Sequence, residues 1–247
     1  MKAFKTMLKI DFILSLRDMN MFIFALCMPL VILVILGMIY GDKSAFDGAS
    51  YSFLTQSFGS MSTIAICAGG LMGLPLVISD YRQKKILKRL QVTPASPTII
   101  LLVQMAIYAI YSVLSLISLY LVGSLFFDLE FIGSLPSFIG SYLLVMISMF
   151  SIGMMVGGIA PNMKMASTIT SILYFPMLIF SGTTLPYEVM PKTVQTIADV
   201  LPLTQGVKLL KATSLGLPLQ DIFVPILVMV IITVICCTIS IKFFKWE

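Results

Sequence analysis

The densest group of charged side chains lies in the stretch DYRQKKILKRLQVTPASP, residues 80–97. Five Lys or Arg residues occur there within eight positions, from Arg82 to Arg89. Such a cluster can bind anionic lipid headgroups, at roughly 1 kcal/mol for each basic residue near the membrane surface. It can also dock on a cytoplasmic partner protein. The chemistry expected of this segment is electrostatic contact, and the residues alone leave both contacts open.

Over residues 80–92 the spacing predicts a short amphipathic helix. Ile86, Leu87 and Leu90 would lie together on it, with the basic residues around the rest of the turn. Pro94 and Pro97 would then end the helix before the next apolar run.

Histidine and the common motifs of catalysis and nucleotide binding are missing from the sequence. There is no His, no GxxxxGK[ST] nucleotide-binding loop, no HExxH and no GxSxG. Cys27, Cys67, Cys236 and Cys237 lie in apolar runs without framework spacing and are interpreted as small buried hydrophobic residues. The chain is therefore not expected to be an enzyme or to hold a metal or cofactor. If the protein performs an energy-requiring function, the energy is expected to come from another subunit.

The basic cluster must be positioned by membrane-spanning helices. Of the 247 residues, 59% are hydrophobic and 11% are charged, whereas soluble domains carry about 25% charged residues. A spanning helix needs about 20 apolar residues, and six runs approach or reach this length, with no ionisable side chain in any interior. These runs cover roughly residues 20–40, 57–79, 98–126, 134–160, 164–183 and 222–241. The first run follows a basic segment but lacks a cleavage motif, so it is expected to be an uncleaved span.

Basic residues outside the runs are distributed unevenly. With a cytoplasmic N-terminus, twelve of the sixteen Lys and Arg residues fall in cytoplasmic segments, and Lys43, Lys192, Lys208 and Lys211 fall outside. Because positive charge accumulates on the cytoplasmic side, both termini are predicted to be cytoplasmic in a cell membrane. The net charge of +5 is thus assigned to topology and lipid contact, and no nucleic-acid partner is expected.

Two further segments are expected at the membrane surfaces. Residues 3–18 place Phe4, Met7, Leu8 and Phe12 near one side, which predicts an amphipathic helix on the inner surface. The outer loop, residues 182–221, contains an apolar stripe that could begin at Pro191 and end at Pro202. A second short helix over about residues 203–213 would complete an outer helical cap or re-entrant hairpin.

Proline and glycine residues within the runs predict local features. Pro29, Pro75 and Pro176 should kink or locally open their helices. Gly69 with Gly73, and Gly153 with Gly157, form GxxxG pairs that allow close helix approach. The pairs serve either packing within one subunit or a dimer contact.

Three segments together resemble the membrane subunits of type-2 ATP-binding-cassette exporters. The first is the pattern L-K-R-L-x-V-T-P-x-S-P, from Leu87 to Pro97. The second runs from Ser181 through Pro186 and Pro191, and continues as LPLT from Leu201 to Thr204. The third is the turn from Gly157 to Met165, with Asn162 and Lys164. This chain departs from the family where an acidic–basic–glycine sequence is common, since Arg82 to Ile86 contains neither Glu nor Gly.

The resemblance implies a fold, partners and contact residues. It implies a single permease domain over residues 1–247: an interfacial helix (1–19), spans one and two (20–79), a cytoplasmic coupling loop (80–97), spans three to five (98–181), an outer helical loop (182–221), and span six with a cytoplasmic tail (222–247). It also implies two cytoplasmic ATPase subunits, which would hold ATP and Mg²⁺, and a second identical or similar permease. The contact with the ATPase is then expected at Asp80, Arg82, Lys84, Lys85, Leu87, Lys88, Arg89 and Leu90, and the outer re-entrant cap at Pro186, Pro191 and Pro202.

The sequence therefore predicts an all-α integral membrane permease that exports a substrate with energy from a separate ATPase. An amphipathic or lipid-like substrate is expected because the spans offer apolar and aromatic side chains, such as Phe150, Tyr174 and Phe175, without fixed charge. Two alternatives remain. A secondary transporter would work without ATP, and a membrane scaffold would bind a partner without nucleotide-binding motifs.

Overall fold

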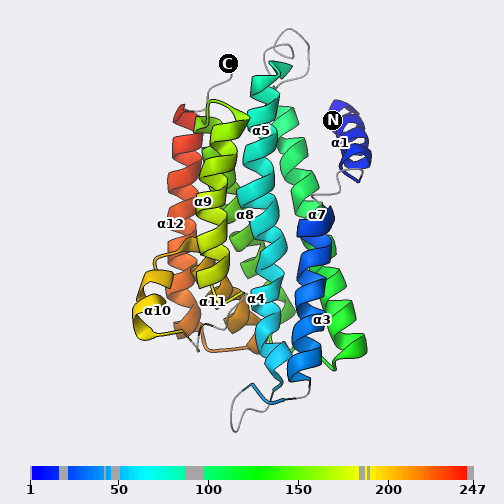
Figure 1. Cartoon of the computed structure of the whole chain (residues 1–247), viewed down its shortest axis with the longest axis vertical. Helices are drawn as coiled ribbons and strands as arrows, with labels where there is room; N and C mark the ends of the chain where they lie inside the picture. The colour runs from blue at the N-terminus through cyan, green and yellow to red at the C-terminus, as the bar shows by residue number, and fades with distance from the viewer. Residues whose placement is uncertain are drawn as a thin grey trace.

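The computed structural model describes residues 2–16, 22–41, 43–45, 51–86, 97–183, 187 and 190–243. These residues form an upright bundle of helices with the N-terminal helix at one side (Figure 1). An isolated bridge joins Ser44 and Ser52, and the described residues contain no sheet. The predicted all-α fold is confirmed.

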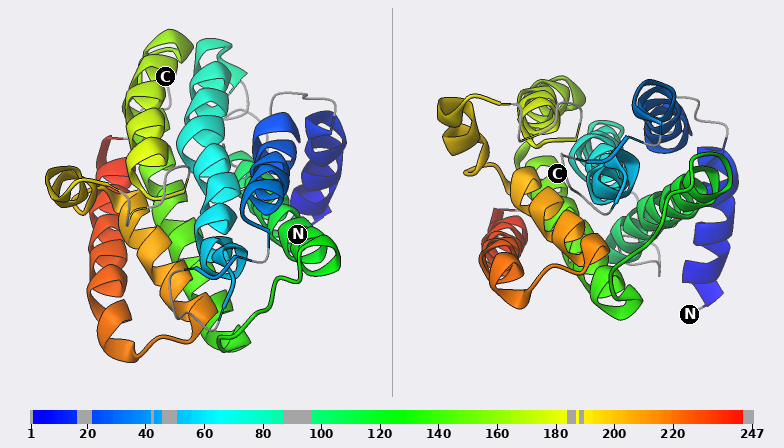
Figure 2. Two further views of the ribbon diagram at one scale, coloured as in Figure 1. Left: turned by 60° about the horizontal axis from the view of Figure 1, so that its bottom comes forward. Right: turned by 90° about the horizontal axis from the view of Figure 1, so that it is seen from below.

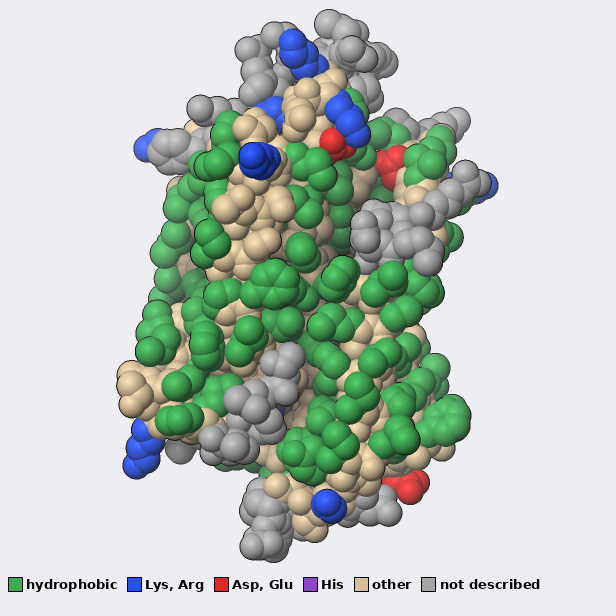
Figure 3. Space-filling view, viewed as in Figure 1, with side chains coloured by type: hydrophobic (Ala, Val, Ile, Leu, Met, Phe, Trp, Pro, Cys, Tyr) green, Lys and Arg blue, Asp and Glu red, His purple; other side chains and the backbone are tan. Residues whose placement is uncertain are grey.

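Six helical segments are long and apolar enough to cross a membrane, and they confirm the six predicted spans. They are Ile23–Tyr40, Phe53–Gln83, Ile99–Phe126, Leu135–Ile159, Met163–Phe180 and Ile222–Lys242. Hydrophobic side chains cover the middle of the visible face, and charged side chains gather at its two ends (Figure 3). The molecule therefore has the surface of a multi-pass membrane protein.

Each of the first two spans begins or continues through a π-helical segment. In the first span, η1 (Ile23–Cys27) leads into α3 (Met28–Tyr40). In the second, α4 (Phe53–Cys67) and η2 (Ala68–Gly73) lead into α5 (Leu74–Gln83). Pro29 and Pro75 occupy the first turn of α3 and α5. A proline removes one backbone donor and crowds the preceding turn, so the wider π turn before each proline confirms the predicted local opening.

The remaining spans are α7 (Pro97–Phe126), α8 (Leu135–Ile159), α9 (Met163–Phe180) and α12 (Leu219–Phe243). Pro176 lies inside α9, which is an uninterrupted α-helix there, so the local opening predicted at this proline does not occur. The second span is the most buried, at 78%, whereas the first and sixth are 22% buried. The α4–η2–α5 column is thus the centre of the bundle, and α3 and α12 present apolar surface outward.

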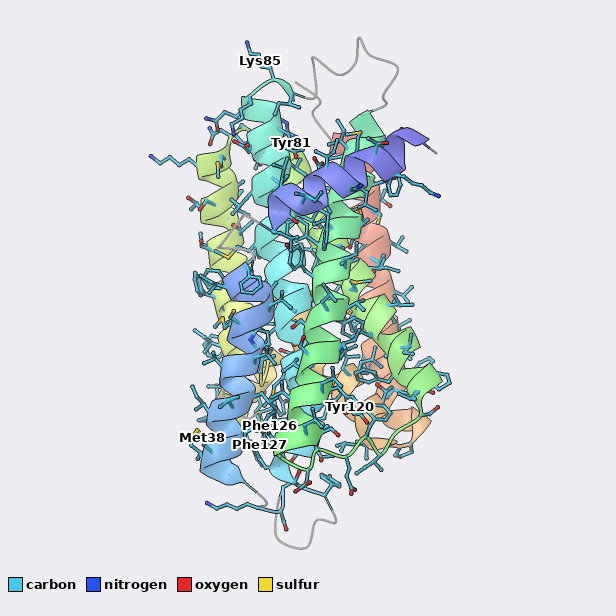
Figure 4. All side chains as sticks on the ribbon, turned by 90° about the vertical axis from the view of Figure 1, so that its right-hand side faces the viewer. Met38, Tyr81, Lys85, Tyr120, Phe126 and Phe127 are labelled. Atoms are coloured by element: carbon cyan, nitrogen blue, oxygen red, sulfur yellow. The ribbon has the colours of Figure 1, made fainter. Side chains whose placement is uncertain are left out.

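Helix α1 (Lys2–Ser15) lies across the upper part of the bundle, against α7 (Figure 4). Its Phe4, Met7, Leu8 and Phe12 pack against a buried cluster of Ala25, Val103, Ile107 and Tyr111. The predicted apolar side of this helix is therefore the side that contacts the bundle. Lys5 and Lys9 are exposed.

Two shorter helices occupy the lower end. Helix α10 comprises Lys192–Ala198, and α11 comprises Pro202–Leu215. Helix α11 crosses the lower end of the bundle (Figure 2) and packs against α4, α8 and α12. Most of its residues are buried. The two helices correspond to the pair predicted between spans five and six, beginning after Pro191 and at Pro202.

Candidate functional site

The upper end of α5, upper as drawn in Figure 1, carries the described part of the basic cluster. Helix α5 ends at Gln83, and Lys84 and Lys85 form a turn, with Lys85 in the left-handed region at φ 55°. Ile86 is helical again. The expectation of one continuous helix over residues 80–92 is therefore wrong, because a left-handed residue cannot continue a right-handed helix. Asp80 instead belongs to the last turns of the second span.

Two of the predicted contact residues are open to a partner. Lys84 and Lys85 are exposed, and the side chain of Lys84 is 63% accessible. The Nζ of Lys84 lies 2.8 Å from Oδ2 of Asp80, one helical turn earlier. An exposed ion pair of this kind contributes less than about 1 kcal/mol, so a partner can displace it at little cost. Leu87, Lys88, Arg89 and Leu90 lie outside the described residues.

Arg82 is not part of this open surface. The residue is only 6% exposed, and its guanidinium donates hydrogen bonds to the carbonyl oxygens of Ala160 and Gly158, the latter at 3.1 Å. These carbonyls lie at the C-terminal end of α8, where backbone acceptors lack partners within the helix. A cation there is also favoured by the helix dipole. The expectation of Arg82 as an accessible contact residue is thus corrected, because the guanidinium joins α5 to the end of α8.

The neighbouring Gln83 joins α5 to the next helix. Its Oε1 accepts a hydrogen bond from the backbone N–H of Met163 at 3.3 Å. Met163 begins α9, and Asn162 caps that helix by accepting from the N–H of Met165 at 2.9 Å. Consecutive residues of α5 therefore hold the end of one span and the start of another. Arg82 and Gln83 thus both form hydrogen bonds to the turn from Gly157 to Met165 that was noted in the sequence.

Beside this end lies a cavity of about 640 Å³ between α1, η1, η2, α5 and α7. Three polar side chains from separate elements meet in its lining. The Nε2 of Gln104, in α7, donates to Oδ2 of Asp11, in α1, at 3.1 Å, and to the hydroxyl of Tyr81, in α5, at 3.0 Å. Burial raises the pKa of Asp11, and the hydrogen bond from Gln104 opposes this shift.

Sequence reasoning did not single out Asp11, Tyr81 or Gln104. One signal was available, since Gln104 is a polar residue within an apolar run and is 7% exposed in the structure. A buried amide in a span needs a partner, but the pattern does not show which residue supplies it.

Helices α10 and α11 are joined by a second polar cluster. The Nζ of Lys208 lies 2.7 Å from Oδ1 of Asp199 and 4.7 Å from the ring centre of Tyr187. The Tyr187 hydroxyl donates to the same Oδ1 at 2.7 Å. Burial acts to raise the pKa of Asp199, but hydrogen bonds from Lys208 and Tyr187 outweigh it and hold this pKa below its usual value. Pro191 and Pro202 flank α10, and Pro186 lies outside the described residues.

The four glycines of the GxxxG pairs all lie at contacts between helices of this chain. A Cβ on Gly69 or Gly73 would meet the ring of Tyr108, in α7. A Cβ on Gly153 would meet the carbonyl oxygen of Gly70, and one on Gly157 would meet Ile78 and Pro75. Of the two roles left open by the sequence, the structure therefore places these positions in packing within the subunit.

The three aromatic residues considered for substrate contact differ in their exposure. Phe150 and Tyr174 are buried, at 3% and 1% exposure, and Phe150 belongs to the main hydrophobic core together with Tyr174. Phe175 is 50% exposed and points outward from α9. The first two are thus packing residues in this conformation.

Comparison with known proteins gives a consistent assignment. The family model "ABC-2 type transporter" matches residues 2–215. The chain is 33% identical over 85 residues to Nodulation protein J of Rhizobium leguminosarum bv. viciae, covering 34% of this chain and 33% of that protein. It is also 33% identical over 72 residues to Nodulation protein J of Neorhizobium galegae, covering 29% and 28% of the two chains. The matched segments thus span about a third of the length of these relatives.

The family model extends over α1, five of the six spans, α10 and α11. It therefore covers the elements that build both ends of the bundle, and the predicted resemblance is confirmed. The chain belongs to the ABC-2 type transporter family and is a multi-pass membrane permease of an ATP-binding-cassette transporter.

Proposed function

We propose that this permease exports its substrate with energy from ATP hydrolysed on separate ATPase subunits. The observation that carries the proposal is the pair of connections made by Arg82 and Gln83. Through them, a displacement of the basic end of α5 is passed to α8 and α9 at the same time. ATP-driven closure of two partners on the cytoplasmic side of the membrane would then rock several spans together and open an outward path.

The upper end is assigned to the cytoplasm. It carries Arg82, Lys84 and Lys85 at the end of α5, Lys164 at the start of α9 and Lys242 at the end of α12. Since positive charge is retained on the cytoplasmic side, both termini are cytoplasmic and α10 and α11 form the outer cap. The protein is placed in the cell membrane, where α1 lies at the inner surface and contacts lipid.

The ATPase partner supplies what the sequence lacks. The chain contains no GxxxxGK[ST] motif, so ATP and Mg²⁺ belong to two partner subunits. The exposed Lys84 and Lys85, the continuing residues Lys88 and Arg89, and α1 form the proposed contact. A second copy of the permease, or a similar permease, completes the membrane part.

The proposed substrate is amphipathic or lipid-like. The described spans present apolar side chains along their length, and the polar groups of the 640 Å³ cavity lie at its cytoplasmic end. A molecule with an apolar body and a polar head matches this distribution.

Purification in mild detergent tests the subunit composition directly. The tagged chain is isolated from its own host and the co-purifying proteins are identified by mass. We expect a soluble subunit carrying GxxxxGK[ST] in a one-to-one ratio with the permease. A chain that emerges alone and transports with an ion gradient, or with a partner that lacks a nucleotide site, would replace this proposal by a secondary transporter or a scaffold.

Charge reversal tests the contact. Replacing Lys84, Lys85, Lys88 and Arg89 together by Glu should lower substrate-stimulated ATP hydrolysis at least fivefold, because each reversed charge repels a surface that the basic residue attracted. ATP hydrolysis is measured in the reconstituted complex. Reversal of Lys43 and Lys192, which are exposed near the opposite end, is the matched control and should leave the rate unchanged. Normal stimulation in the quadruple variant would contradict the proposed contact.

A further inference from the structure

The cavity beside α1 has an uneven distribution of charge. Among the seventeen described residues that line it are two carboxylates, Asp11 and Asp80, and no Lys or Arg. Ser15, Tyr81 and Gln104 add neutral polar groups, and the other lining residues are apolar or aromatic. The described lining is thus acidic at one end and apolar along the walls. This lining lies within a chain whose net charge is +5.

The Asp11 carboxylate is only partly compensated. It is half-buried and accepts one hydrogen bond from Gln104, and no described Lys or Arg forms an ion pair with it. A carboxylate withdrawn from water gains most from an opposite charge nearby. Asp80 is paired with Lys84, but the Lys84 side chain is 63% accessible and does not line the cavity. The carboxylate of Asp80 can therefore contact a ligand cation in the cavity, whether or not it stays paired with Lys84.

Gln104 provides a second polar group for a ligand. Its side chain is 7% exposed, and its amide nitrogen is occupied by Asp11 and Tyr81. The amide oxygen accepts none of the hydrogen bonds formed among the described residues around it. This oxygen belongs to a side chain that lines the cavity, so a ligand donor that enters between the two carboxylates could satisfy it.

The apolar walls define the body of the ligand. Leu76, Val77 and Met72 come from the second span, Ile107 and Tyr108 from α7, and Phe24 from the first span. The volume of about 640 Å³ falls in the range of about 300–1,000 Å³ typical of small-molecule sites. Tyr108 and Phe24 also offer aromatic faces, which attract cations.

We propose that this cavity binds an amphipathic cation, with the positive group between Asp11 and Asp80 and the apolar body against η2, α5 and α7. The inference rests on the proposed function, because an amphipathic cation bound here would be the substrate that the permease exports. The binding step itself needs neither ATP nor an ATPase subunit, so it can be tested separately.

Two ions of the same size and shape provide the test. Tetraphenylphosphonium is a lipophilic cation, and tetraphenylborate is its anionic counterpart. Binding of each to the full chain in neutral maltoside micelles is measured by equilibrium dialysis, with protein-free micelles as the blank. We expect saturable binding of the phosphonium and none of the borate. Equal saturable binding of both ions would overturn the proposal, and this comparison requires no variant.

Variants then locate the site. Asp11→Asn and Asp80→Asn should each weaken phosphonium binding about threefold, and the double variant about tenfold, because both remove a charge and keep the side-chain shape. Met72→Trp should also weaken phosphonium binding, because the larger side chain would fill part of the cavity. Asp128→Asn is the matched control at the opposite end, where the residue is exposed and has φ 47°, a conformation that Asn tolerates. Unchanged binding in the double variant would contradict the assignment.

Phosphatidylcholine also carries a quaternary ammonium group on an apolar body, although its phosphate makes the whole lipid neutral. Adding it to the micelles distinguishes the two sources of the ligand. Displacement of the phosphonium assigns the site to a lipid headgroup, and no displacement assigns it to a free amphipathic cation. If the cation binds as expected but no ATP-driven transport is found, the site stands and the proposed function fails. ATP-driven transport without selective cation binding gives the opposite result.

Discussion

An Arg82→Met variant is expected to lose about 3 kcal/mol of stability. The guanidinium donates two hydrogen bonds to the carbonyl oxygens of Gly158 and Ala160, and a hydrogen bond to a charged group contributes about 1.5–3 kcal/mol. Methionine fills a similar volume but leaves these buried acceptors at the end of α8 without that donor. The apparent melting temperature, measured by fluorescence-detected size exclusion of the detergent-solubilised protein, should fall by several degrees.

The matched control for Arg82 lies two residues away. Lys84→Met removes a basic side chain of the same helix end, but this side chain is exposed and its ion pair is weak. Its melting temperature should stay close to that of the wild type. An Arg82→Lys variant keeps the charge but lacks the two-pronged geometry, so an intermediate value is expected. If Arg82→Met melts like the wild type, the connection between α5 and α8 is not stabilising.

Gly153→Ala is expected to be as damaging as the loss of Arg82. The added Cβ would meet the carbonyl oxygen of Gly70, which is backbone and cannot rotate away. The two helices must then separate, and overpacking of this kind costs about 1–3 kcal/mol or more. We expect a cost near the upper end of this range, about 3 kcal/mol, since η2 lies at the centre of the bundle and α8 packs directly against it. Thermal unfolding and the yield of folded protein in detergent measure it.

The same helix supplies the control for Gly153. Gly140 is also in α8, but nothing lies within 4 Å of the Cβ that an alanine would add. Gly140→Ala should therefore be neutral or stabilising, since alanine favours the helix by up to about 1 kcal/mol. Two identical substitutions in one helix should thus differ by several kcal/mol. Similar melting temperatures for both variants would show that the close approach of α8 to η2 is not required.

The spans could be predicted because a lipid environment imposes requirements that each helix meets within its own sequence. Each run must be apolar over about 20 residues and must satisfy its own backbone hydrogen bonds. This requirement is met within the segment itself, so composition and length were sufficient for all six spans. The π turns before Pro29 and Pro75 were predictable as local opening for the same reason, because proline acts on its own helical turn.

The apolar side of α1 was also visible in the sequence, from the helical spacing of Phe4, Met7, Leu8 and Phe12. The spacing did not reveal what this side would contact. The structure places it against α7 and η1, with residues such as Ile10 and Leu14 exposed on other sides. A helical period shows that one side differs from another, whereas the choice between a lipid surface and a protein surface depends on the neighbouring helices.

The role of each charged residue in the cluster required tertiary structure. Arg82 and Lys84 are two positions apart and of like charge, yet one is buried against the end of α8 and the other is exposed. Their difference arises because residues two apart in a helix face different directions, and only the packing of α8 shows which direction is buried. The sequence by itself thus determined the six spans, the amphipathic pattern of the N-terminal helix and the basic end. The connection through Arg82, the packing of the four glycines and the meeting of Asp11, Tyr81 and Gln104 depended on contacts between distant segments, which no local pattern specifies.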